Sequence, residues 1–283
     1  MSQDRQRKTE KTIGIIGFGS MGGVLLRSLL RFGALIEQEV IVSTRSREKL
    51  SGFISKYPGL EVIQSNADLA ERCHTVFICV GTNEVKGVIE EISPSLAEDA
   101  HLVYISGGLT ISNVAKKYDG KISKVIPSLT CGTRNCVILV HHNEKVTEDN
   151  SMRLERCLSK IGTVKIIAED QFEIGADITS CAPAFMAAMM KHFTAAAVKN
   201  SVFSEEEALV MVRTTMLGTA TLLSKRKIPF DNLIDRVATN GGITGDGVKV
   251  LDEKLPAVFD ELFAVTLAKN DAVKAGMDEQ YGS

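Results

Sequence analysis

The fold of this chain is decided by one short stretch near its start, which reads Gly14-Ile15-Ile16-Gly17-Phe18-Gly19-Ser20-Met21-Gly22. The stretch holds the pattern G-x-G-x-x-G, directly after a β-rich run and at the start of a helical pattern. In that setting Gly17 permits a tight turn, Gly19 lets a pyrophosphate approach the backbone, and Gly22 allows close packing of helix and strand. The pyrophosphate then meets free N–H groups at a helix N-terminus. We therefore expect a dinucleotide site formed by Gly17, Phe18, Gly19, Ser20, Met21 and Gly22.

Short β-rich runs alternate with helical patterns from Thr12 to about Ile167. This alternation predicts a mainly parallel sheet with helices on both faces. We expect an α/β Rossmann domain over residues 12–168, preceded by a flexible tail at residues 1–11. The expected strands are Thr12–Ile16, Val40–Ser43, Glu61–Ile63, Thr75–Val80, Leu102–Ile105, Ser123–Ile126, Cys136–His141 and Val164–Ile167.

Helical patterns replace the β-rich runs after about Glu169. The segment Ala184–Val198 is apolar on nearly every side, and such a helix must be buried all round. A helical domain of this size can hardly bury it alone, so we expect residues 169–283 to form an all-α dimerisation and substrate domain. A homodimer through this domain is predicted, and a higher assembly of dimers is left open. The expected helices are Pro183–Asn200, Ser204–Leu223, a short piece near Asn232–Val237, Thr244–Glu253 and Pro256–Gly276.

The composition limits the classes of partner. The net charge is −2, so no basic field favours nucleic acid. No apolar run reaches the roughly 18–20 residues that span a bilayer, so no membrane partner is expected. Six cysteines are scattered without a CxxC pair or a metal-binding pattern. We expect no metal, and a reducing compartment, the cytoplasm.

The end of the second expected strand reads Ser43-Thr44-Arg45-Ser46-Arg47. An NAD enzyme usually has Asp or Glu there, which would repel a 2′-phosphate, whereas a guanidinium binds one through charge-assisted hydrogen bonds. The sequence therefore favours NADP(H), with NADPH preferred over NADH, and Thr44, Arg45 and Ser46 as contacts. The alternative is that Arg45 and Arg47 are solvated charges on a turn.

Small residues follow the fourth and fifth expected strands, at Val80-Gly81 and at Gly107. Ligands of open α/β sheets bind at the carboxyl ends of the strands. We expect Val80, Gly81 and Gly107 to let the backbone approach the ribose and nicotinamide. Ordinary glycine-containing loops are the alternative.

A paired glycine, Gly241-Gly242, interrupts the helical domain and is followed by the hydroxyl residue Thr244. Backbone N–H groups at the start of the next helix would form a small anion site that suits a carboxylate. A plain helix–turn–helix with a glycine cap is the alternative.

On these motifs the chain resembles the pyrroline-5-carboxylate reductase family, which joins a GxGxMG Rossmann domain to a helical dimerisation domain. The family signature V-[ST]-S-P-G-G-x-T-x-x-[AG] is matched by Val237, Gly241, Gly242 and Thr244; Thr239 stands in for the second Ser, and Gly247 falls at the final small position. The resemblance implies that Asn66 contacts NADPH, and that the protein reduces a cyclic imino acid, 1-pyrroline-5-carboxylate, to proline. It further implies that Thr239, Gly241 and Gly242 bind the substrate carboxylate and that the catalytic Thr244 hydroxyl bonds the ring nitrogen.

The chain departs from the family pattern on the substrate and nicotinamide loops, so the exact imine and the retention of catalysis stay open. One alternative is a non-catalytic NADP-binding regulatory relative. Another is a β-hydroxyacid-type dehydrogenase with Lys191 as general acid, although Thr194 stands where that family has Asn. The departures are Gly81 for a lysine, Ser128-Leu129-Thr130 for N-T-P, Cys181-Ala182 for S-G, and Asn240 for a proline.

Overall fold

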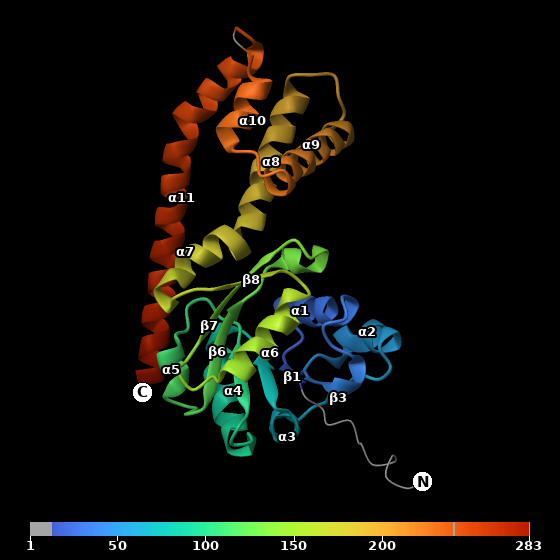
Figure 1. The fold of residues 1–283 in the computed structure, drawn as a ribbon, viewed down its shortest axis with the longest axis vertical. Helices are drawn as coiled ribbons and strands as arrows, with labels where there is room; N and C mark the ends of the chain where they lie inside the picture. Colours follow the sequence, from blue (N-terminus) through green and yellow to red (C-terminus); the bar gives the residue numbers. More distant parts are fainter. Residues whose placement is uncertain (1–12, 240, 283) are drawn as a thin grey trace. The chain divides into compact units, whose positions relative to one another are not determined.

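The computed structural model describes residues 13–239 and 241–282, except for the side chain of Arg47. The expected tail and Asn240 lie outside this range. Two compact units make up the fold (Figure 1). The sheet unit contains the residues up to Cys181 together with those from Leu267 onward, and the helical unit contains Ala182–Thr266.

The sheet unit is built on eight strands in the order β3-β2-β1-β4-β5-β6-β7-β8. All neighbouring strands run parallel except β6 and β7. The predicted mostly parallel sheet is thus confirmed, with strand ends that differ by at most two residues. The bounds are β1 Ile13–Ile16, β2 Val40–Ser43, β3 Glu61–Ile63, β4 Thr75–Ile78, β5 His101–Tyr104, β6 Lys121–Ile126, β7 Val137–His142 and β8 Thr163–Ile166.

The sheet has an apolar core on each face. Successive residues of a strand pack in opposite cores, because side chains alternate between the two faces of a pleated strand. Ile15 packs in one apolar core, and the next residue, Ile16, packs in the other. The first core lies under α1 (Ser20–Arg31), α2 (Ser51–Lys56) and α6 (Glu148–Ser159). The second core is covered by α3 (Asn66–Arg72), α4 (Val85–Ile92), α5 (Ile111–Ala115) and the end of α11.

The helical unit contains α8 (Ala182–Lys199), α9 (Glu205–Lys225), α10 (Phe230–Val237) and the first part of α11 (Ile243–Gly282). Helix α9 begins as predicted, with the Ser204 hydroxyl accepting from the Glu207 N–H. All residues of α8 are described, and Thr194 is the one among them that is buried. The neighbouring Phe193 is 68% exposed. The apolar α8 is therefore largely uncovered in a single chain, as an interface helix would be.

The prediction of two helices, Thr244–Glu253 and Pro256–Gly276, is wrong. Helix α11 is continuous and carries Pro256 inside it. A proline removes one hydrogen bond and crowds the preceding turn, which costs about 3 kcal/mol. In this structure α11 nevertheless continues past Pro256 as one helix. Its last turns pack on the sheet unit, where Met277 and Tyr281 are buried and Asn113 Nδ2 donates to Asp278 Oδ1 over 2.9 Å.

Cys131 and Cys136 form a disulfide, which the scattered cysteine pattern did not predict. Both residues are buried between the end of β6 and the start of β7, and the other four cysteines are not in a disulfide. Within residues 13–239 and 241–282, no cluster of His, Cys, Asp and Glu side chains could hold a metal ion. No helix in the same ranges has both the length and the apolar character needed to cross a membrane.

Candidate dinucleotide site

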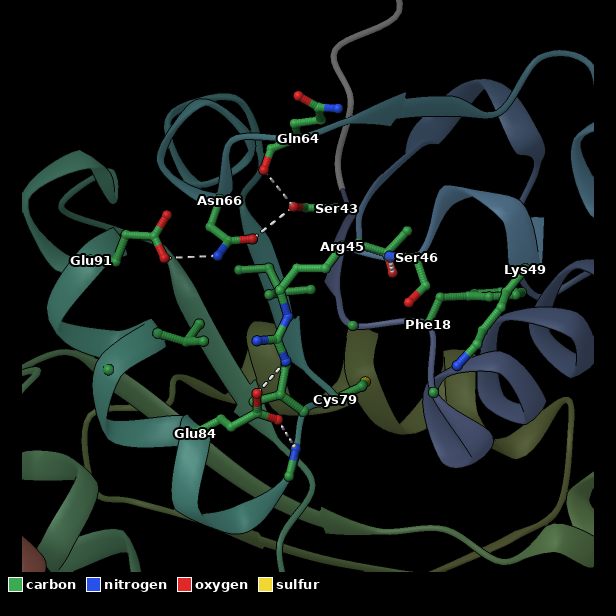
Figure 2. A pocket seen from close by; sticks show the side chains of 18 residues that line it. Phe18, Ser43, Arg45, Ser46, Lys49, Gln64, Asn66, Cys79, Glu84 and Glu91 are labelled. Atoms are coloured by element: carbon green, nitrogen blue, oxygen red, sulfur yellow. Dashed lines mark hydrogen bonds and ion pairs between the residues drawn. The ribbon is translucent and has the colours of Figure 1, made fainter. Parts of the chain in front are cut away.

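A cavity of about 460 Å³ lies at the carboxyl ends of β1, β2 and β4 (Figure 2). Strand order reverses here, because β1 pairs with β2 on one side and with β4 on the other. Open α/β sheets bind ligands at this switch point. The lining residues are Ile16, Gly17, Phe18, Gly19, Ser43, Thr44, Arg45, Ser46, Lys49, Gln64, Asn66, Cys79, Val80, Gly81, Glu84, Gly87, Val88 and Glu91.

The glycine turn between β1 and α1 has the geometry that its sequence demands. Gly17 has a φ of +98°, and a Cβ atom there would lie 2.7 Å from the Cys79 carbonyl oxygen. A Cβ on Gly22 would lie 2.8 Å from Cys79 Cβ, so this glycine brings α1 close to the end of β4. A Cβ on Gly19 would meet nothing within 4 Å. Since no side chain caps α1 at Gly19, its first N–H groups are left for a ligand.

Arg45 extends across the cavity from the end of β2 and forms an ion pair with Glu84 (Figure 2). The other Glu84 carboxylate oxygen accepts from the Gly81 N–H over 3.1 Å. The hydrogen bond from Arg45, followed by the one from Gly81, lowers the pKa of Glu84 below its ordinary value. Because 86% of the Arg45 side chain is exposed, the pair is weak and Arg45 can change partner.

A chain of hydrogen bonds joins the end of β2, the start of α3 and the end of α4 along another wall (Figure 2). The Ser43 hydroxyl donates to Asn66 Oδ1 over 2.7 Å, and Asn66 Nδ2 donates to Glu91 Oε2 over 2.8 Å. Ser43 is buried and fixed, whereas Glu91 is exposed. This wall thus presents carboxylate and amide oxygens, which can accept from ribose hydroxyls.

The structure brings most of the expected cofactor residues to one cavity. Ser20, Met21 and Gly22 lie in the first turn of α1 and do not line it, and neither does Gly107. The lining residues among those expected are Gly17, Phe18, Gly19, Thr44, Arg45, Ser46, Asn66, Val80 and Gly81.

The Gly107 loop is held by a lysine that the sequence analysis did not single out. Lys124 is fully buried in β6, and its Nζ donates to the Gly107 carbonyl over 3.0 Å. Glu169 Oε1 lies 4.0 Å from the same Nζ, which also lies 4.6 Å from the centroid of the Phe172 ring. Burial lowers the pKa of Lys124, and Glu169 opposes that shift.

The glycine-paired turn lies at the start of α11 in the helical unit. Gly241 has a φ of +74°, and the Gly242 N–H donates to the Thr239 carbonyl over 2.8 Å. Thr239 and Thr244 are exposed on either side of the pair. The four residues Thr239, Gly241, Gly242 and Thr244 are therefore close together, with the Gly242 N–H engaged inside the turn.

Comparison with known proteins decides the family. The chain is 32% identical over 269 residues to pyrroline-5-carboxylate reductase 3 of Bacillus subtilis (strain 168), covering 95% of this chain and 98% of the relative. This chain belongs to the pyrroline-5-carboxylate reductase family. Members are NAD(P)H-dependent oxidoreductases that act on a C=N bond. Within the chain, residues 169–273 match the family model for pyrroline-5-carboxylate reductase dimerisation, and residues 12–107 match the one for coenzyme F420-dependent NADP oxidoreductases.

Solved structures of the pyrroline-5-carboxylate reductase family share the fold. A Coxiella burnetii member superimposes with a TM-score of 0.85 at 24% identity, over 93% of this chain and 98% of that one. A Plasmodium falciparum member, solved with NADP bound, gives 0.83 at 23% identity with the same coverage. The predicted combination of a Rossmann domain with an all-α C-terminal region is confirmed.

Several further residues of the site were not predicted from the sequence, although some of them carry a local signal. Lys49 follows Arg45 by four positions, and Glu84 follows Gly81 by three. A lysine inside an apolar strand, as at Lys124, is itself unusual because charged side chains are rarely fully buried. Glu91 had no such signal, since it reaches the cavity from the far part of α4.

Proposed function

We propose that this chain uses NADPH to reduce a cyclic imino acid, 1-pyrroline-5-carboxylate, to proline. The observation that carries the proposal is the glycine-turn cavity with Arg45 at the end of β2, in a chain that aligns with a pyrroline-5-carboxylate reductase over almost its whole length. A preference for NADPH over NADH follows from Arg45 and Lys49, which are suited to a 2′-phosphate.

The described residues fit a dinucleotide of this kind. The uncapped N-terminus of α1 suits the pyrophosphate, and Gly19 leaves room for it. Asn66 and Glu91 offer oxygens to ribose hydroxyls, while Thr44, Arg45 and Ser46 surround the adenosine end. The Gly107 loop, held by Lys124, is assigned to the nicotinamide end. NADPH, when bound, supplies the hydride for the C=N carbon.

The helical unit would provide the substrate site. Thr239 and the backbone at Gly241 are assigned to the substrate carboxylate, and Gly242 supports them through the shape of the turn. The Thr244 hydroxyl would hydrogen-bond the ring nitrogen and orient the imine. A protonated imine is already electrophilic, so the chain needs mainly to position it. The nitrogen keeps its proton as hydride arrives, and the product is the secondary amine.

The proposal includes a homodimer through the helical unit. The match to the family's dimerisation region supports a homo-oligomer, and the exposed apolar side chains of that unit, among them Phe193, Leu217 and Phe230, suit an interface. Light scattering at several protein concentrations would measure the assembly.

A cytoplasmic location is also proposed, on the ground that four of the six cysteines are not in a disulfide. The Cys131–Cys136 disulfide is the observation that points the other way. Alkylation of thiols in intact cells before lysis tests the location. If the protein is cytoplasmic, Cys131 and Cys136 should both be alkylated, which shows that this pair is reduced in the cell.

The experiment for the activity is a substrate series with NADPH: 1-pyrroline-5-carboxylate, other cyclic imines, and hydroxy or keto acids. Turnover of the first is expected, and Thr244→Ala should lower that rate while NADPH affinity stays near the wild-type value. NADPH binding without turnover of any compound would favour a non-catalytic relative. Turnover of a hydroxy acid with NADP⁺ would favour the dehydrogenase with Lys191.

A further inference from the structure

A second cavity, of about 300 Å³, lies in the sheet unit between α1, α2 and the turn after β6. It shares no lining residue with the dinucleotide cavity. The two are adjacent, since Phe18 of the first packs on Phe53 of the second with ring centroids 5.4 Å apart. The residues that line the second cavity are Val24, Arg27, Ser28, Arg31, Phe53, Lys56, Tyr57, Leu129 and Gly132.

Three of these residues, Arg27, Arg31 and Lys56, are cations, and none of the lining residues is acidic. All three are exposed, and no carboxylate of the described chain forms an ion pair with them. They rest instead on aromatic rings, with Arg27 on Phe18, Arg31 on Phe32 and Lys56 on Tyr57. Three positive charges therefore surround one cavity without a counter-ion among the residues that the structure describes.

Ser28 adds a hydroxyl group to the lining of this cavity. The residue is 2% exposed and lines the cavity, yet its hydroxyl makes no hydrogen bond to any residue that the structure describes. Helical serines commonly bond the carbonyl four residues earlier. The Ser28 hydroxyl is thus placed to bond something that enters the cavity.

We propose that this cavity binds a small phosphorylated ligand at a site separate from the dinucleotide. Guanidinium groups bind phosphate oxygens through paired charge-assisted hydrogen bonds, which suits Arg27 and Arg31. Lys56 adds a third charge, and Ser28 donates from the cavity floor. Leu129, which is 55% exposed, and Tyr57 offer apolar surface to the organic part of the ligand.

The test is calorimetric titration of the full-length protein with inorganic pyrophosphate, in the presence of saturating NADP⁺ to fill the dinucleotide cavity. The double variant Arg31→Ala/Lys56→Ala should weaken binding by at least about tenfold, as expected for the loss of two charge-assisted hydrogen bonds. Arg27 is kept, because its guanidinium packs on Phe18 of the dinucleotide cavity. Ser28→Ala should weaken binding by a smaller factor.

The matched control is Arg153→Ala/Arg156→Ala, which removes two cations from α6 and should leave the Kd unchanged. Retained NADP⁺ binding shows that each variant is folded. Pyrophosphate that does not bind the wild type, or that binds Arg31→Ala/Lys56→Ala as tightly as the wild type, would overturn the proposal.

Discussion

The guanidinium of Arg45 forms an ion pair with the carboxylate of Glu84 across the edge of the dinucleotide cavity. Arg45 comes from the end of β2, and Glu84 lies 39 residues later, in the turn after β4. Ion pairs between exposed side chains are worth about 0–1 kcal/mol. A 2′-phosphate carries more charge than a carboxylate and can replace Glu84 as the partner of Arg45.

Arg45→Ala is expected to raise the KM for NADPH by roughly tenfold to a hundredfold, because one or two charge-assisted hydrogen bonds to the 2′-phosphate are lost. The KM for NADH should change little, since NADH has no such phosphate. Steady-state kinetics with both cofactors measures the ratio. Arg153→Ala, which removes another exposed ion-paired arginine, is the control. An equal rise for both cofactors would assign Arg45 to the fold and not to the phosphate.

Glu84→Gln should have the opposite effect. The substitution replaces the carboxylate that competes for Arg45 with a neutral amide, and so removes a negative charge from the cavity. NADPH should therefore bind a few times more tightly. Fluorescence titration with NADPH gives the Kd. The gain should disappear in Arg45→Ala/Glu84→Gln, because the two side chains act through one interaction. Weaker NADPH binding in the single variant would show that Glu84 itself contacts the cofactor.

Lys124→Met is expected to destabilise the fold by about 3 kcal/mol, since it leaves the Gly107 carbonyl without its donor and Glu169 without a nearby cation. Urea unfolding measures the loss. Lys121→Met is a matched control on the same strand, because Lys121 Nζ donates to the Asp99 carbonyl at the surface. Equal losses in the two variants would refute a special role for Lys124.

Stability should fall in acid because of His101. This side chain is buried beside Ser123 and His142, and burial lowers its pKa from 6.5 to about 3. Between these values the unfolded chain binds a proton that the folded chain does not, so stability is lost as pH falls below 6.5. The slope is about 1.4 kcal/mol per pH unit for one group. His142, whose pKa burial also lowers, adds to it.

Urea unfolding at about pH 7 and about pH 5 tests this dependence. His101→Gln should reduce the loss of stability between the two conditions, whereas His74→Gln, at a largely exposed histidine, should not. An unchanged loss in His101→Gln would mean that other groups cause the acid sensitivity.

The sheet was predictable because its signals are local. Each strand is a short apolar run between turn residues, and the glycine turn after β1 identified the ligand end of the sheet. The continuity of α11 was not predictable in this way, because the local sequence around a proline usually indicates the end of a helix. In the structure α11 continues through Pro256, and its buried residues, Met277 and Tyr281, lie near its end, where it packs on the sheet unit.

The cavity was predictable in part. Residues that directly follow a strand, such as Arg45 and Val80, were expected there and line it. Glu84 and Glu91 come from a helical turn and a helix, whose side chains reach the cavity through tertiary packing. The disulfide was missed for a related reason, since spacing alone does not show that a turn brings the Cα atoms of Cys131 and Cys136 to 5.0 Å.

The most direct measurement combines the full-length protein, NADPH and 1-pyrroline-5-carboxylate, and quantifies proline and NADP⁺ together. Proline should appear in a one-to-one ratio with the NADPH consumed, and faster with NADPH than with an equal concentration of NADH. No proline from a protein that binds NADPH normally would contradict this prediction.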